Sequence, residues 1–147
     1  MEGGNISQSA RSGQACFFED LLVSRPTGTS LIKSKYYEKT GDWKAALKLW
    51  RPNDLPLKSL IDTVERLHVS TEVITFLSPD AVEPIYQWLV RKGVMTNVEY
   101  YESVEDYGMD LRYNRSITTV YVAKQEDALI LGPRSTVVSP NTEWGRF

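Results

Sequence analysis

The sequence has only one cysteine, Cys16, and one histidine, His68. A single cysteine excludes an intrachain disulfide, and one cysteine with one histidine is too few for a zinc cluster of Cys and His ligands. No apolar run approaches the roughly 18 residues of a membrane span, and the first residues, MEGGNISQSARSGQ, lack the apolar core of a signal peptide. We therefore expect a chain that is not secreted and does not enter a membrane.

The sequence also lacks a strong excess of charge of either sign. Its 17 Lys and Arg residues and 19 Asp and Glu residues give a net charge of −2. This balance gives no electrostatic reason to expect binding to nucleic acid or to an anionic membrane. The length of 147 residues fits one domain. Residues 1–14, rich in Gly, Ser, Asn and Gln, predict a flexible arm before a domain at 15–140 and a tail at 141–147.

Strand-like runs of β-branched and aromatic residues alternate with amphipathic stretches along the chain. This alternation is typical of βαβ units around a mainly parallel sheet. We predict an α/β fold in three layers, with a mostly parallel, Rossmann-like sheet of about five strands and helices on both faces. The expected strands cover residues 15–20, 72–77, 98–101, 117–122 and 136–139.

Helix signals occur between the first and third of these strands. Apolar residues at helical spacing predict helices over residues 43–50 and 54–67. A third helix begins at Ser78 and ends at Gly93. Pro84 lies inside it, so either the helix is kinked there or its regular part starts one residue earlier. Residues 25–42 have no clear period and predict a loop with at most one short element.

The order of these elements over residues 15–140 resembles the core of the haloacid-dehalogenase-like (HAD) superfamily. Members have an early strand ending in a hydrophobic-Asp-x-Asp pattern, a second strand ending in Ser or Thr, and a later strand leading into acids. The matching segments are residues 16–20, residues 72–75 and residues 118–122, the last of which leads to Glu126 and Asp127. The stretch VYVAKQEDALILGPRSTVVSP is the most similar. The resemblance implies a HAD-like fold.

The catalytic positions of that family are not filled. Its chemistry needs a carboxylate nucleophile and a second Asp two residues later. If Asp20 is the second Asp, Phe18 stands where the nucleophile should be, and Glu19 points to the opposite face of the strand. Ala123 and Lys124 follow the acidic strand where acids are expected. The resemblance therefore implies a scaffold without its active site, and we expect no catalytic residue, no metal site and no cofactor.

Four polar residues near the expected strand ends are vestigial or ligand-binding candidates: Asp20, Thr75, Ser78 and Asp127. A hydroxyl at a strand end that leads into a helix can bind a phosphate together with the free amides of the helix. The structural alternative is that Ser78 only begins a helix. In that alternative Asp20 faces solvent or a backbone amide, and Glu19 pairs with a nearby Arg or Lys.

Four aromatic residues belong to no periodic element that could bury them: Tyr36, Tyr37, Trp144 and Phe147. Tyrosine and tryptophan often anchor protein interfaces, and a large exposed apolar patch usually marks one. We therefore expect the N-terminal arm, the segment 25–42 and the tail to contact other protein chains, in a homo-oligomer or a larger assembly.

These observations favour a non-catalytic HAD-like domain that acts as a protein-interaction or structural component. Small HAD-like proteins of this kind are similar to bacteriophage proteins, which places the chain in the cytoplasm or within a viral particle. The alternative is a capless, magnesium-dependent phosphatase that acts on a nucleotide or polynucleotide end through Asp20 and Asp127. A third hypothesis is a ligand sensor that binds phosphate without hydrolysing it.

Overall fold

A computed structural model describes residues 13–144 of the chain. Its main sheet has five strands in the order β5-β4-β1-β6-β7, and every neighbouring pair is parallel. This confirms the predicted α/β fold with a Rossmann-like sheet. The five strands are β1 (Gly13–Phe17), β4 (Thr71–Thr75), β5 (Val98–Tyr100), β6 (Ile117–Val122) and β7 (Ser135–Val137).

The sheet order determines where a crevice forms. From β1 the chain moves outward through β4 to β5, and it then returns to the other side of β1 at β6. In open α/β sheets, ligands bind outside the carboxyl ends of the strands at the point where the strand order reverses. In this protein that point lies between β1 and β6.

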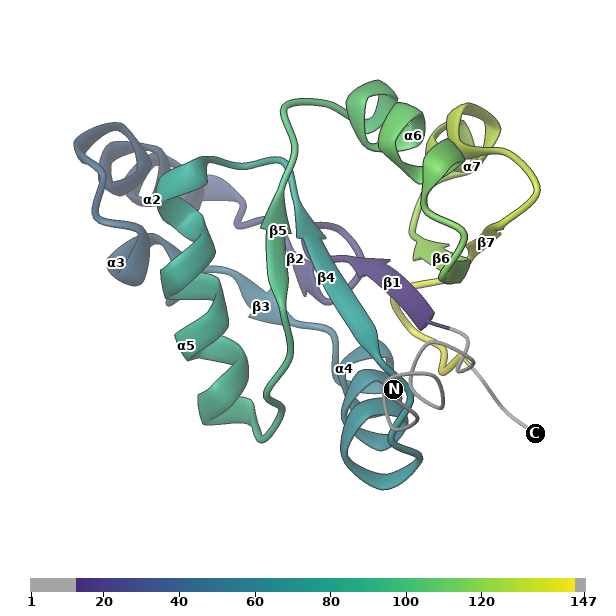
Figure 1. The fold of residues 1–147 in the computed structure, drawn as a ribbon. Coiled ribbons are helices and arrows are strands. Elements are labelled where there is room, and N and C mark those ends of the chain that lie inside the picture. Colours follow the sequence, from purple (N-terminus) through teal and green to yellow (C-terminus); the bar gives the residue numbers. More distant parts are fainter. Residues whose placement is uncertain (1–12, 145–147) are drawn as a thin grey trace.

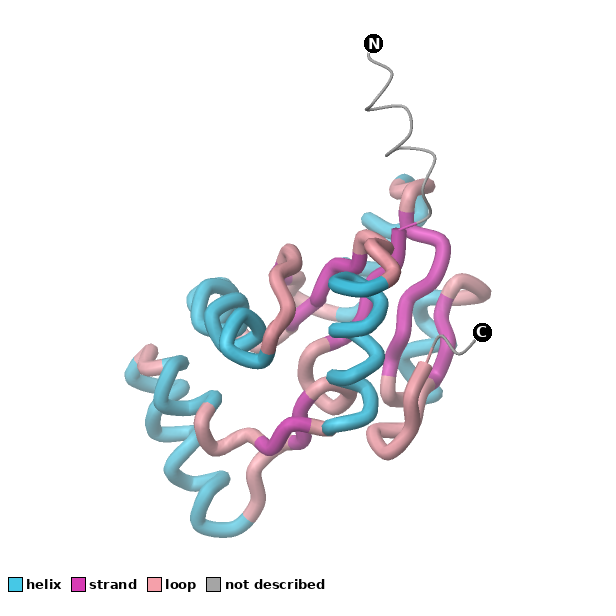
Figure 2. Tube along the Cα trace, turned by 90° about the horizontal axis from the view of Figure 1, so that it is seen from below, coloured by secondary structure: helices cyan, strands magenta, loops and turns pink. Residues whose placement is uncertain are grey.

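Helices cover both faces of the sheet, as the sequence predicts (Figure 1). In Figure 1, α2, α3 and α5 lie on one side of the sheet and α6 and α7 on the other, and in Figure 2 the magenta strands run between cyan helices. None of the helices between residues 13 and 144 is long and apolar enough to cross a membrane. The helical elements are α2 (Gly28–Thr40), α3 (Trp43–Leu47), α4 (Asp54–Ile61), the π-helical turn η1 (Asp62–Arg66), the 3₁₀ turn η2 (Pro79–Ala81), α5 (Val82–Lys92), α6 (Val104–Tyr113) and α7 (Gln125–Leu131).

The residues of β1 alternate between two hydrophobic cores. Cys16 belongs to the core beneath α3, α4 and α5, whereas Ala15 and Phe17 belong to the core beneath α6 and α7. Successive side chains of a strand point to opposite faces, so one apolar run can serve both cores. A strand with both faces covered reads as a continuous apolar run, as β1 does.

Local signals explain the helix that follows β4. The Ser78 hydroxyl accepts a hydrogen bond from the Asp80 amide at 3.1 Å, and the chain ends this helical stretch at Gly93 in a left-handed conformation with φ of 103°. Pro84 is the third residue of α5, where the missing N–H has no helical partner to lose. The regular helix therefore begins at Val82, two residues before the proline.

The segment 25–42 departs from the prediction of a loop, since most of it is the helix α2. The sequence gives no helical period because α2 fully buries only one side chain, that of Ser34. The Trp50 indole Nε1 donates to the Ser34 hydroxyl at 3.3 Å, so a polar contact holds the helix. A short antiparallel pair, β2 (Val23–Ser24) with β3 (Arg51–Pro52), joins the chain before α2 to the chain after α3.

Both predicted domain boundaries need correction. Gly13 and Gln14, assigned to the arm, form the start of β1. Residue Trp144, assigned to the tail and to an interface, is only 6% exposed and belongs to the core beneath α4. Its ring stacks on Tyr121 of β6, with centroids 4.7 Å apart, and its amide donates to the hydroxyl of Ser59 on α4 at 2.9 Å. Periodicity could not reveal this burial because the contacts come from distant elements.

We expect Trp144→Ala to destabilise the fold by about 3–5 kcal/mol, because it leaves a cavity between β6 and α4. Urea unfolding measures this loss. Trp144→Phe is the matched control: it keeps an aromatic ring against Tyr121, and the buried Nε1 that it removes has no hydrogen-bond partner among the described residues. A near-neutral alanine variant would contradict the assignment of Trp144 to the core.

Candidate functional site

A crevice of about 230 Å³ lies at the carboxyl ends of the strands. The residues that line it come from the ends of β1, β4 and β6 and from the starts of α6 and α7. This is the position at which a parallel sheet of this order binds ligands. The lining residues are Phe17, Glu19, Asp20, Arg25, Phe76, Ser103, Val104, Lys124 and Asp127.

Phe18, which the HAD resemblance would align with the nucleophile, is not among the residues that line this crevice. Its side chain is fully buried in the core on the other face, and its ring meets that of Trp88 edge-on with centroids 5.6 Å apart. The backbone of Phe18 continues the strand ladder, because its amide donates to the Ile74 carbonyl at 2.9 Å. Phe18 therefore serves packing and offers no reactive group.

Glu19 is buried at the inner end of the crevice and is held by two hydrogen bonds. The Thr75 hydroxyl donates to Oε1 at 3.0 Å, and the Phe76 amide donates to Oε2 at 2.8 Å. Burial raises the pKa of this carboxyl, an effect that the two hydrogen bonds and the charge of Arg25 partly oppose. Glu19 thus links the end of β1 to the end of β4.

Asp20 occupies a left-handed backbone conformation, with φ of 73°. Asp tolerates this region better than most residues. The carboxylate receives two hydrogen bonds from Arg25, Nε to Oδ1 at 3.0 Å and Nη2 to Oδ2 at 3.2 Å. The ammonium group of Lys124, which follows β6, lies 3.4 Å from Oδ2. Two cations from different segments therefore neutralise Asp20.

Asp127 lies in the first turn of α7 and also lines the crevice. Burial raises the pKa of its carboxyl. The ammonium group of Lys124 opposes that rise, while the charges of Glu126, Asp20 and Glu105 add to it. Lys124 is therefore the cation that both crevice aspartates share electrostatically.

The structure brings together three of the four candidates taken from the sequence. Asp20 and Asp127 line the same crevice, and Thr75 reaches it through its hydrogen bond to Glu19. Thr75 is fully buried and also accepts a hydrogen bond from the Leu77 amide at 3.2 Å. Ser78 is not among the lining residues and caps η2, as the structural alternative predicts.

Three charged residues that line the crevice were not among the site candidates taken from the sequence: Glu19, Arg25 and Lys124. The structural alternative expected Glu19 to pair with an Arg or Lys and Asp20 to face solvent or an amide. The structure has the reverse, because the left-handed turn at Asp20 interrupts the alternation of a strand. Lys124 follows closely after an apolar strand, and this position in the sequence could have indicated that it lies in the crevice.

The aromatic interface candidates fall into three groups. Tyr36 on α2 is 65% exposed, and Tyr37 is half-buried beside it with ring centroids 5.7 Å apart. Trp144 is a core residue, as described above. Phe147 lies outside the described residues. Among the candidates that the structure describes, exposed aromatic surface therefore lies on α2.

The carboxylates Glu19 and Asp20 of the crevice are engaged by neighbouring groups of the protein. Within residues 13–144, no group of three or more His, Cys, Asp or Glu side chains is placed to hold a metal ion. No protein-family model matches this chain, and no curated protein or solved structure matches it either. The chemistry of the crevice is that of a carboxylate network satisfied by neighbouring donors.

We expect the stability of the fold to depend on the protonation of Glu19. Its pKa is raised in the folded state, so the folded state binds this proton more tightly than the unfolded state does. This contribution is fully present below the unfolded pKa, near 4.5, and is lost as pH rises through the higher folded pKa. Glu19→Gln removes the titration, so the variant should gain stability relative to the natural protein as pH rises from 4.5.

Urea unfolding at pH 4.5, 6 and 7.5 measures this difference. Glu102→Gln is the control, because it removes an exposed carboxylate without a hydrogen-bonding role in the crevice. Its stability should follow that of the natural protein at each pH. A Glu19→Gln profile parallel to the natural one would rule out the proposed coupling.

Proposed function

We propose that this chain is a non-catalytic HAD-like domain that acts as a protein-interaction or structural component and binds another protein chain through α2. Three adjacent strand ends support the HAD-like assignment: acids follow β1, Thr75 ends β4, and Asp127 lies in the helix that follows β6. These are the segments on which the resemblance rests.

One observation carries the interaction part of the proposal, the surface of α2. Ile32 is 72% exposed and Tyr36 65% exposed, and the two are four residues apart, so they lie on one face of the helix. Leu31 is also exposed beside them. Large apolar side chains gathered on a surface helix are typical of a protein-binding face.

The charges of α2 indicate the chemistry of the partner. Lys33, Lys35 and Lys39 are exposed, and none forms an ion pair with a carboxylate among residues 13–144. Complementary charge speeds association and selects partners. The partner surface is therefore apolar at its centre and acidic at its edge.

The crevice supports the non-catalytic part of the proposal. Both oxygens of Asp20 are engaged by Arg25 and Lys124, and both oxygens of Glu19 accept hydrogen bonds from β4 and the residue after it. A magnesium site needs carboxylate oxygens free to converge on the ion. Releasing Asp20 would break its contacts with both Arg25 and Lys124, which makes that change unfavourable.

We expect the double variant Ile32→Ser/Tyr36→Ala to lose partner binding by about thirtyfold or more, since central interface side chains often contribute about 2 kcal/mol each. Its stability should change by no more than about 0.5 kcal/mol, because both side chains are exposed. Binding is measured by quantitative affinity capture from the native source, and self-association by analytical ultracentrifugation.

The matched control is Met109→Ser/Tyr113→Ala on α6. These two residues are likewise four apart and are 60% and 86% exposed, but they lie on the other side of the sheet. The proposal requires that the α6 variant keep the captured proteins or oligomer that the α2 variant loses. Equal losses in both variants, or no loss in either, would contradict it.

The alternative function, a magnesium-dependent phosphatase, has a direct test. We expect no release of phosphate from p-nitrophenyl phosphate or from a 5′-phosphorylated oligonucleotide above background at neutral pH with magnesium. Asp20→Asn should therefore change nothing measurable. A turnover that Asp20→Asn abolishes would favour the phosphatase and reject the non-catalytic proposal.

A further inference from the structure

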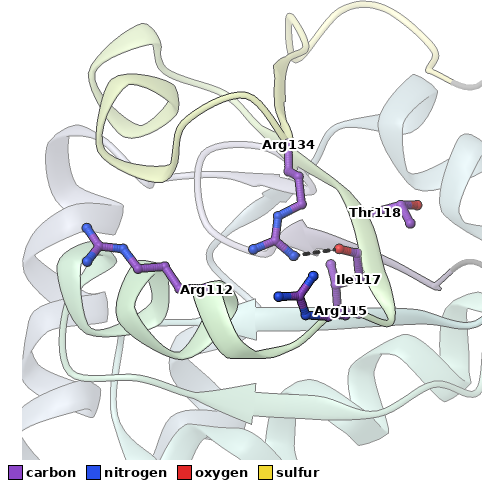
Figure 3. Close-up of a pocket in the computed structure, with 5 residues that line it drawn as sticks. All are labelled: Arg112, Arg115, Ile117, Thr118 and Arg134. Atoms are coloured by element: carbon purple, nitrogen blue, oxygen red, sulfur yellow. Dashed lines mark hydrogen bonds between the residues drawn. The ribbon is translucent and has the colours of Figure 1, made fainter.

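A second pocket, of about 480 Å³, lies at the opposite end of the sheet from the crevice. It is formed where the chain enters β6 and β7, and three of its five lining residues are arginines (Figure 3). The lining residues are Arg112, Arg115, Ile117, Thr118 and Arg134. No carboxylate lines this pocket, in contrast to the crevice.

Arg134 is fixed in position by the backbone. Its Nη1 donates to the carbonyl oxygens of Asn114 at 2.8 Å and Ile117 at 2.9 Å, and its Nη2 donates to the carbonyl oxygen of Leu111. A guanidinium group has five N–H donors, so two of them, the Nε–H and one Nη2–H, have no partner among the described residues. The ordering of this side chain is complete before any ligand binds, which lowers the entropy cost of binding.

Arg115 adds a second positive charge at the same place. In Figure 3 its guanidinium group lies beside that of Arg134, whereas the side chain of Arg112 points away from both. Within residues 13–144 neither Arg115 nor Arg134 pairs with a carboxylate. The carbonyl end of α6 contributes at most about half a negative charge near Arg134. Two like charges therefore share a site with too little counter-charge.

We propose that this pocket binds the dianionic phosphate group of a phosphomonoester between Arg115 and Arg134. A phosphate dianion matches the two positive charges, and its oxygens accept charge-assisted hydrogen bonds from both guanidinium groups. A carboxylate would neutralise only one of them. The pocket is larger than the phosphate group alone, so the organic part of the ester lies toward Ile117 and Thr118. This site is separate from the crevice and from the proposed binding face of α2.

The probes are inorganic phosphate and phenyl phosphate, titrated into the full chain at pH 7.5 and followed by isothermal calorimetry, with acetate as the monoanion reference. We expect saturable binding with a Kd on the order of 1 mM or tighter for phenyl phosphate. Arg115→Gln should weaken it about tenfold or more, the loss expected for charge-assisted bonds from one guanidinium group. Arg91→Gln removes the same charge from an exposed residue of α5, on the other side of the sheet and outside the pocket, and should change the Kd less than about twofold.

Each other outcome overturns the proposal. Equal binding by Arg115→Gln and the natural protein would exclude this site. Equal weakening in both arginine variants would show that the net charge of the protein, and not this pocket, determines the binding. Lys124→Gln tests the crevice: if it abolishes binding while Arg115→Gln does not, the phosphate binds at the crevice. No saturable binding, or binding no tighter than that of acetate, would also reject a phosphate site here. Circular dichroism of each variant ensures that only folded proteins are compared.

Discussion

The arrangement of this protein depends on β1, which is the centre of the sheet. It is hydrogen-bonded to β4 on one edge and to β6 on the other, and its side chains enter the cores on both faces. The backbone at the start of β1 is tightly packed, because a Cβ at Gly13 would lie 3.0 Å from the carbonyl oxygen of Ser116. Because β1 runs parallel to both neighbours, the chain leaves it at the carboxyl end of the sheet, between the ends of β4 and β6. That exit places Glu19 and Asp20 where the strand order reverses, so the location of the crevice follows from the topology.

The two ends of the sheet differ in how their charges are balanced. At the carboxyl end, each cation already faces a carboxylate, and a phosphate would have to displace Asp20 from both Arg25 and Lys124. Displacement would leave a partly buried carboxylate without its partners, which opposes binding. At the amino end, the carbonyl dipoles at the end of α6 hold Arg134 without cancelling its charge. An anion therefore meets a competing carboxylate at one end and none at the other. The position that the fold makes available for ligands is the less favourable one for phosphate in this sequence.

The features that depend on residues close in the sequence could be predicted from it. The features that depend on contacts between distant residues could not. The five strands were predictable because runs of β-branched and aromatic residues pack in a sheet wherever they are covered. The helix α2 was not, because its buried position is Ser34, a polar residue whose partner Trp50 lies in another element. Trp144 was misassigned for the same reason, since its burial depends on Tyr121 and Ser59. At the crevice, the family resemblance singled out Asp20 and Asp127, but the left-handed backbone at Asp20 exchanged the expected roles of Glu19 and Asp20.

The ion pair in the crevice also has a structural consequence for α2. Arg25, which binds Asp20, lies over the ring of Trp50 at 5.4 Å from its centroid, and the indole of Trp50 donates to Ser34 inside α2. A continuous series of polar and cation–π contacts thus leads from the end of β1 to the helix that carries Ile32 and Tyr36. Each contact is modest, with a cation–π pair worth about 0.5–1 kcal/mol when exposed. Together they fix the orientation of a helix that buries little apolar surface of its own. The carboxylate of Asp20 therefore has a structural role in this chain, because it anchors the contacts that lead to the surface through which we propose that the protein binds its partner.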